Sequence, residues 1–114
     1  MEIKERKVTT FVTGSGRAPY EEWFETLKDK RAQALVLSRI DRVCLGNFGN
    51  CKSVGNGVYE LRIYYSSGLR IYFGLEGEQV VILLCGGDKG SQRKDIAYAQ
   101  ELWMEYKKDA NKKL

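Results

Sequence analysis

The chain has 114 residues, of which 43% are hydrophobic and 30% are charged, and it contains a single proline. This length and composition are those of one globular domain, so we expect one domain over residues 1–114 and exclude an intrinsically disordered chain. Lysine and arginine number 19 against 15 aspartates and glutamates, for a net charge of +4. Such a mildly basic balance is compatible with a polyanionic partner without establishing one.

Histidine is absent from the sequence, and this narrows the available chemistry. Its absence excludes Ser-His-Asp and Cys-His nucleophiles, histidine metal sites and acid–base catalysis by paired histidines. Cys44, Cys51 and Cys85 are odd in number and lack Cys-x-x-Cys spacing, so neither a disulfide framework nor a zinc site is expected. We therefore expect no metal and no cofactor, and any catalysis must use lysine, arginine, tyrosine or carboxylates.

The sequence shows no sign of a membrane or secretory segment. No apolar run approaches the roughly 18 residues that a membrane helix needs. The N-terminal segment Met1–Lys7 is charged and lacks the apolar core of a secretory signal. These features predict a cytoplasmic location and no contact with a membrane.

The first half of the chain predicts one strand followed by two helices. The β-branched run from Lys4 to Val12 is typical of a strand. Pro19 is well placed to open a short helix, and the apolar residues after it have helical spacing: Tyr20, Trp23, Phe24 and Leu27. Asp29 can cap a second helix over about residues 30–45, and Gly46 is a natural C-terminal stop for it.

The second half changes to period 2, which is typical of strands with one core face. Over residues 58–65 and 69–75, odd-numbered apolar residues alternate with polar or aromatic ones. A three-residue loop over 66–68 predicts a hairpin, and its even-numbered side chains are expected to form an exposed polar face. Its register is expected to pair arginines with tyrosines: Tyr64 with Arg70, and Arg62 with Tyr72.

The remaining segments complete an α+β order. Gln79–Cys85 is a continuous apolar run, which predicts a strand buried on both sides. Gly86–Gly90 is glycine-rich and predicts a loop, and a final helix is expected from about Ser91, with Trp103 in its apolar seam. The predicted order is β-α-α-β-β-β-α, with an antiparallel meander sheet packed against helices.

Three motifs follow one another along this predicted hairpin and strand. They are Glu60-Leu61-Arg62, then Gly68-Leu69-Arg70, then Gly86-Gly87-Asp88-Lys89. Together with the Trp23-Phe24 helix they resemble the RelE/ParE toxin superfamily, in particular the HigB-like addiction module killer branch of type II toxin–antitoxin systems. The resemblance covers about residues 5–100, and the predicted element order is that of the superfamily's fold.

The resemblance implies a small toxin that a cognate antitoxin neutralises. Most characterised members of the superfamily cleave mRNA, usually on the ribosome, whereas the ParE branch poisons DNA gyrase. We expect a metal-independent, ribosome-associated mRNA endonuclease that inhibits translation. Because fold alone does not separate these outcomes, the alternatives are a ParE-like gyrase inhibitor without nuclease activity and a non-toxic mobile-element remnant that only binds a partner.

RNA cleavage without metal requires the 2′-OH to be deprotonated, the leaving 5′-oxygen to be protonated and the phosphorane charge to be neutralised. The resemblance assigns Arg70, Arg62 and Lys89 to this catalysis, with Arg70 holding the scissile phosphate. Each also has a structural interpretation. Arg70 can stack on Tyr64, Arg62 can pair with Glu60 or with a helix carboxylate, and Lys89 can be an exposed loop residue.

Three further residues are candidates for RNA binding. Lys52 can present its charge to the RNA backbone, while Tyr64 and Tyr72 can stack on a base, although cross-strand packing is the competing role for both tyrosines. Asp88 is expected to cap a helix or turn rather than act as a catalytic acid.

Overall fold

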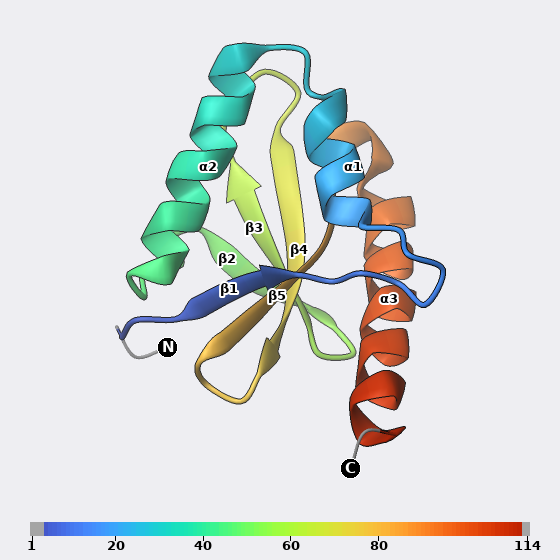
Figure 1. The fold of residues 1–114 in the computed structure, drawn as a ribbon. Helices are drawn as coiled ribbons and strands as arrows, with labels where there is room; N and C mark the ends of the chain where they lie inside the picture. The colour runs from blue at the N-terminus through green and yellow to red at the C-terminus, as the bar shows by residue number, and fades with distance from the viewer. Residues whose placement is uncertain (1–3, 113–114) are drawn as a thin grey trace.

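A five-stranded mixed sheet forms the centre of the computed structural model, which describes residues 4–112 (Figure 1). The first three residues of the charged N-terminal segment lie outside this range. The elements in chain order are β1 (Lys7–Thr10), α1 (Pro19–Thr26), α2 (Lys30–Cys44), β2 (Cys51–Gly55), β3 (Val58–Ile63), β4 (Leu69–Glu76), β5 (Val80–Asp88), the 3₁₀ turn η1 (Lys89–Ser91) and α3 (Gln92–Lys112).

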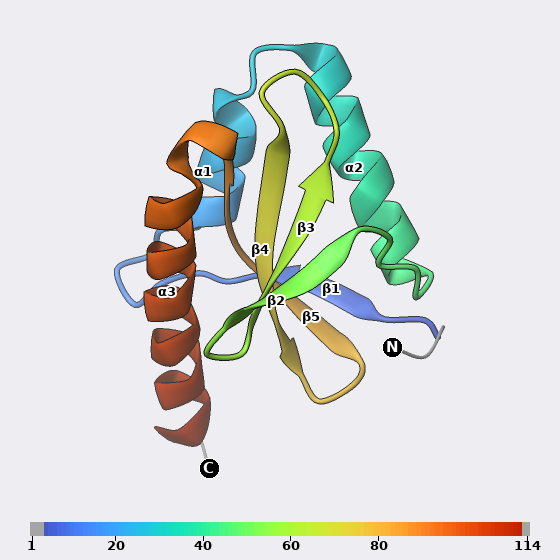
Figure 2. The same ribbon diagram turned by 180° about the vertical axis from the view of Figure 1, so that it is seen from behind.

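The strand order across the sheet is β1-β5-β4-β3-β2. Strands β2 to β5 form an antiparallel meander, and β1 joins its far edge parallel to β5. Helices α1 and α2 pack on one face and α3 packs on the other (Figures 1 and 2). The predicted α+β class and meander are confirmed, and the structure adds that the sheet is covered on both faces.

Both N-terminal helices form where the sequence predicts them. Pro19 opens α1, and the Oδ1 atom of Asp29 accepts a hydrogen bond of 2.9 Å from the Arg31 amide at the start of α2. Gly46, with φ of 92°, follows the end of α2, as expected of a residue that must adopt a left-handed conformation. The apolar side of α2 then buries Val36 and Val43 against the sheet.

Strand β2 was not predicted, and the observed order therefore contains five strands among residues 4–112. Its sequence, Cys-Lys-Ser-Val-Gly, shows no apolar alternation, and all five residues are at least partly exposed. An edge strand of this kind forms because it pairs with β3, so tertiary context decides its conformation.

The predicted loop over Gly86–Gly90 was also wrong, because β5 continues to Asp88. A Cβ atom on Gly86 would overlap the indole of Trp23, and one on Gly87 would overlap the carboxylate of Asp95. These two glycines therefore allow close packing on a strand rather than a loop.

The register of the β3–β4 hairpin differs from the predicted one by two residues along β3. Arg62 lies opposite Arg70, and Glu60 lies opposite Tyr72. The connection spans residues 64–68 rather than 66–68, with positive φ at both Ser66 (51°) and Gly68 (79°). This wider loop removes residue 64 from the ladder, so the predicted Tyr64–Arg70 and Arg62–Tyr72 pairs do not form.

The even-numbered face of the hairpin is not an exposed polar face. Helix α3 lies over it, and the side chains of Leu102 and Trp103 pack in the same cluster as the buried ring of Tyr72. Glu60 and Arg70 are buried as well. Among residues 4–112, none of the helices combines the length and apolarity that a membrane crossing requires.

Replacing Gly74 with alanine is expected to destabilise the fold by about 1–3 kcal/mol, because the added methyl group would overlap the indole of Trp103. Chemical denaturation measures this loss. Gly14 offers a matched control, since a Cβ there would meet nothing closer than Glu105 Oε2 at 3.9 Å. Equal stability of both variants would contradict the packing of α3 on β4.

Candidate active site

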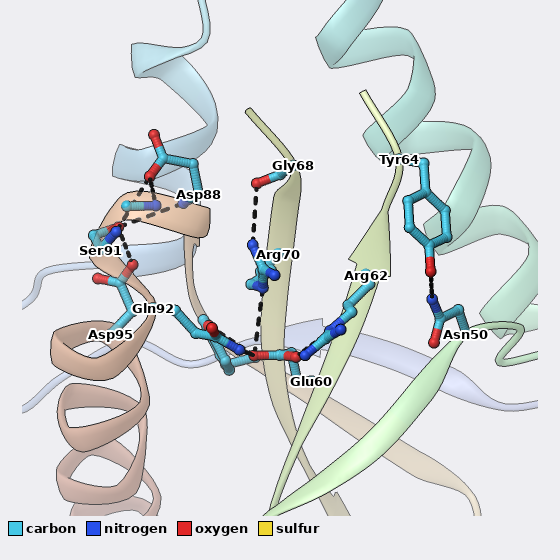
Figure 3. Close-up of polar contacts among 12 residues, drawn as sticks. Asn50, Glu60, Arg62, Tyr64, Gly68, Arg70, Asp88, Ser91, Gln92 and Asp95 are labelled. Carbon is cyan, nitrogen blue, oxygen red and sulfur yellow. Dashed lines mark hydrogen bonds and ion pairs between the residues drawn. The ribbon is translucent and has the colours of Figure 1, made fainter. Parts of the chain in front are cut away.

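The structure brings Arg62, Arg70 and Lys89 to one end of the sheet. Figure 3 shows the two arginines on neighbouring strands. Arg62 on β3 and Arg70 on β4 are direct cross-strand neighbours. Lys89 follows β5 directly, and its backbone amide donates a hydrogen bond of 3.2 Å to the carbonyl of Ser67 in the β3–β4 loop. The three predicted catalytic residues thus come from adjacent strands or strand ends.

A single buried carboxylate, that of Glu60, organises this end of the sheet (Figure 3). Arg62 Nε donates to Glu60 Oε1 at 2.8 Å, and Arg70 Nε lies 3.7 Å from Glu60 Oε2. The hydroxyl of Tyr72 and the side-chain amide of Gln92 also donate to Oε2, at 3.0 and 2.9 Å. The Glu60 cluster (Glu60, Arg62, Arg70, Tyr72 and Gln92) therefore joins β3, β4 and the start of α3.

The surroundings of Glu60 keep it ionised despite its burial. Burial raises the pKa of Glu60, but hydrogen bonds from Arg62, Gln92 and Tyr72 outweigh that effect and leave the pKa below its ordinary value. The pKa of Tyr72 moves upward, first through burial and then through the Glu60 carboxylate, so this phenol stays protonated. The hydrogen bond to Glu60 likewise raises the pKa of Arg62.

Arg70 is held in place without having its hydrogen-bonding capacity used up. Its side chain is 9% exposed, and Nη1 donates to the carbonyl of Gly68 over a long 3.5 Å. Its Nε atom is buried with no hydrogen-bond partner, since the Glu60 oxygen at 3.7 Å is beyond hydrogen-bond range. Two guanidinium groups therefore share one carboxylate, which leaves positive charge for an anionic ligand.

The turn that carries Lys89 is fixed by its neighbour Asp88. The Asp88 Oδ1 atom accepts hydrogen bonds from the amides of Gly90 at 2.8 Å and Ser91 at 3.3 Å, in a reciprocal capping arrangement. The expectation that Asp88 serves as a cap is confirmed. The backbone of Lys89 is thereby anchored while the residue itself remains exposed to solvent.

The three predicted RNA-binding residues lie in different surroundings. Lys52 is exposed on β2 opposite Glu60, and Tyr64 is 84% exposed, its hydroxyl accepting a 2.9 Å hydrogen bond from Asn50. Tyr72 is fully buried beneath α3. Its ring has no face open to a base in this structure, so we withdraw the stacking role and assign Tyr72 to the support of Glu60.

Sequence reasoning missed that Glu60 is the centre of the cluster and that Gln92 belongs to it. It considered Glu60 only as a partner for Arg62, and that ion pair is confirmed. A carboxylate in a strand whose residues, apart from Arg62, are apolar or aromatic was a usable signal, because a buried charge requires partners. Gln92 carried no such signal, since it is 32 residues away in sequence.

The cysteines take no part in this cluster. All three are free, and burial raises the pKa of Cys51 to about 11 and that of Cys85 to about 12. The thiols of Cys51 and Cys85 therefore remain protonated at neutral pH and are poor nucleophiles. Within residues 4–112, no group of three or more Cys, Asp or Glu side chains is arranged to hold a metal ion.

Comparison with known protein families shows which family the chain belongs to. The model of the phage-derived Gp49-like protein family matches residues 22–108. The chain belongs to this Gp49-like family. An uncharacterized protein of Haemophilus influenzae is 46% identical to it over 86 residues, which cover 75% of this chain and 87% of the relative. No solved structure matches the chain.

Membership in the Gp49-like family places the chain among RelE-like toxins of toxin–antitoxin systems, which are usually paired with an antitoxin. The matched segment contains the whole Glu60 cluster together with Lys89, Lys52 and Tyr64. A toxin-like role is therefore shown at the level of the family.

Proposed function

We propose that this chain is the toxin of a type II toxin–antitoxin module, in the HigB-like branch of the RelE/ParE superfamily, and that it cleaves mRNA on the ribosome without a metal ion. The main support is the Glu60 cluster, in which Arg62 and Arg70 share one buried carboxylate beside Lys89. A rigidly held pair of guanidinium groups suits the stabilisation of a phosphorane.

In this proposal each cation has a separate task. Arg70 makes one long hydrogen bond, from Nη1, while its Nε faces Glu60, so its Nη groups bind the non-bridging oxygens of the scissile phosphate. Arg62, 32% exposed and fixed by Glu60, adds charge on the neighbouring strand. Lys89, exposed on an anchored turn, approaches the leaving 5′-oxygen from β5.

Lys52 and Tyr64 bind RNA around this centre. Lys52 is exposed one strand beyond Glu60, where its charge contacts the backbone. The 84% exposed ring of Tyr64 is large, flat and tethered only by Asn50, which suits stacking on a base next to the cleaved bond.

Two assays run in parallel test this function. Purified protein is added to a reconstituted translation reaction and mRNA 5′ ends are mapped, while the same preparation is tested for inhibition of gyrase supercoiling. We expect new 5′ ends within translated codons and no effect on gyrase. Gyrase inhibition without cleavage would instead establish a ParE-like toxin, and inactivity in both assays would favour a remnant that only binds a partner.

The pH profile of cleavage is expected to lack a limb near pH 6.5. The sequence contains no histidine, and imidazole is the side chain whose ordinary pKa, about 6.5, lies in that range. Single-turnover cleavage rates between pH 5.5 and about 8 measure the profile. A steep protein-dependent limb near pH 6.5 would contradict catalysis by the cations of the Glu60 cluster and Lys89.

The cognate antitoxin is expected to cover this cationic end of the sheet. An acidic segment of the antitoxin would neutralise Arg62, Arg70 and Lys89 and block access of RNA. Hydrogen exchange of the complex, compared with the free toxin, should show added protection over residues 60–72 and 86–106. Added protection confined to residues 20–45 would contradict masking of the site.

A further inference from the structure

A second cationic site lies where α2 meets the end of β3, beside the Glu60 cluster. The structure contains a hollow of about 330 Å³ there. Its polar walls are Ser38, Arg39 and Arg42 of α2 together with Asn50, Arg62 and Tyr64. Strand β2 begins only at Cys51, and just before it the carbonyl of Asn50 accepts a hydrogen bond of 3.0 Å from the amide of Arg62 near the end of β3.

Arg39 is a buried cation at the base of this hollow. It is 8% exposed, and its guanidinium donates to the backbone carbonyls of Arg62, Phe48 and Asn50. Its Nε atom is buried with no hydrogen-bond partner. Carbonyl groups fix the position of the guanidinium but leave its charge uncompensated, which is costly in a buried site.

Arg42 brings a second positive charge to the same place. A Cβ atom on Gly49 would lie 3.0 Å from Arg39 Nη2 and 3.2 Å from Arg42 Nη2, so the two guanidinium groups converge on this glycine. Burial, and then the charge of Arg42, lower the pKa of Arg39. Within residues 4–112, neither arginine forms an ion pair with a carboxylate.

Helix geometry explains only part of this arrangement. Arg42 lies in the last turn of α2, where the helix dipole favours one cation. The dipole does not account for a second, buried guanidinium facing the first. Two converging and unpaired guanidinium groups beside a hollow are a good match for an oxyanion such as phosphate.

We propose that this hollow is a second phosphate subsite, which binds a nucleotide of single-stranded RNA next to the one held by Arg70. This proposal rests on the proposed RNA-cleaving function and extends it. Arg42 binds the phosphate, the positive charge of the buried Arg39 adds to the attraction, and Tyr64 stacks on the adjoining base. Arg62 borders both sites, because its side chain joins Glu60 and it also lines the hollow.

The position of Tyr64 favours RNA over an acidic peptide as the occupant. In Figure 3, Arg62 lies between Arg70 and Tyr64, so the two sites form one row across the strands. A polynucleotide repeats a phosphate and a base along its length. Along this row the protein presents two cations, Arg70 and Arg62, followed by the exposed aromatic ring of Tyr64. Aromatic stacking beside cations is a common way to bind single-stranded nucleic acid.

The salt dependence of RNA binding tests the subsite. A short single-stranded RNA with 2′-O-methyl groups, which the toxin cannot cleave, is bound to wild type, Arg42→Gln and Arg31→Gln, and affinity is measured by fluorescence anisotropy over a range of salt concentrations. Arg31 is an exposed arginine on the same helix outside the hollow, which makes it the matched control.

We expect Arg42→Gln to reduce the slope of log K against log salt by about 0.7, which is the effect of losing one phosphate contact to a single strand. Arg31→Gln should keep the wild-type slope. Tyr64→Leu should weaken binding about tenfold at every salt concentration without changing the slope, because stacking is not an ionic contact.

A folded Arg42→Gln protein with the wild-type slope would overturn the subsite, as would a wild type that does not bind the oligonucleotide. Loss of antitoxin affinity in Arg42→Gln with an unchanged RNA slope would also overturn it and place the antitoxin in the hollow. The cleavage assay is scored separately. A wild type that cleaves no mRNA while Arg42→Gln loses slope refutes the nuclease but supports the phosphate subsite.

Discussion

Replacing Arg70 with alanine is expected to abolish growth arrest and also to destabilise the protein by about 2 kcal/mol. The sequence placed Arg70 on an exposed face, where such a truncation changes stability by only about 0.5 kcal/mol. The structure corrects that expectation, because the Arg70 side chain is 9% exposed and 3.7 Å from the buried Glu60 carboxylate. Expression in a sensitive host and chemical denaturation measure the two effects.

Arg70→Lys separates the catalytic effect from the structural one. Lysine keeps a positive charge near Glu60, so we expect most of the stability to be retained, but it lacks the planar fork that binds two phosphate oxygens. Toxicity should therefore fall far more than stability. Arg31→Ala, an exposed arginine on α2, controls for loss of a charge elsewhere. A folded Arg70→Lys protein with full toxicity would contradict the assignment of Arg70 to the scissile phosphate.

The sequence predicted one face of the hairpin well and the other poorly. Odd-numbered residues such as Leu61 and Ile71 are apolar and do pack against α2. Glu60 and Tyr72 looked solvent-facing because each carries a polar group. Their hydroxyl and carboxylate bond to each other, so both can be buried under α3, and single-strand periodicity carries no information on such a partner.

The register of the β3–β4 hairpin and the pairing of edge strand β2 could not be predicted from local sequence patterns for a related reason. The position of Arg62 opposite Arg70 depends on a loop that also uses positive φ at Ser66, a conformation that non-glycine residues seldom adopt. Strand β2 has weak intrinsic preference and forms by pairing with β3. Both features are decided by contacts between segments.

The candidate site was predictable in its cations but not in its organisation. Arg62, Arg70 and Lys89 came from the family resemblance, and the structure brings them to one end of the sheet. The support from Gln92 depends on how α3 packs. The hollow of Arg39 and Arg42 was missed because an arginine on the sheet-facing side of a helix is usually explained as one that extends to solvent.

Replacing Glu60 with glutamine is expected to abolish growth arrest and to cost about 3 kcal/mol of stability, the range for breaking a buried ion pair. Glutamine has nearly the same size, so packing beneath α3 is preserved. What is lost is the negative charge that Arg62 and Arg70 share. Without it the two buried or half-buried guanidinium groups repel each other and no longer keep their geometry for phosphate.

The pH dependence of stability tests whether the negative charge of Glu60 is the cause of the expected stability loss in Glu60→Gln. The pKa of Glu60 is lower in the folded protein than its unfolded value of about 4.3, so its contribution is present above that value and is lost as pH falls through the folded pKa. Wild type should therefore lose more stability on acidification from pH 5 than Glu60→Gln. Carboxylates such as Glu22 and Glu78, whose pKa values are also lowered by cationic partners, occur in both proteins and cancel in the difference.

Gln92→Leu distinguishes support of the carboxylate from general packing of α3. This variant removes one hydrogen bond to Glu60 while keeping both ion pairs, so we expect a loss of about 1 kcal/mol and a partial loss of toxicity. We expect both stability and toxicity to be lowest in Glu60→Gln, intermediate in Gln92→Leu and highest in wild type. A stable, fully toxic Glu60→Gln protein would contradict this order, because Arg62 and Arg70 would then keep a working geometry without the carboxylate between them.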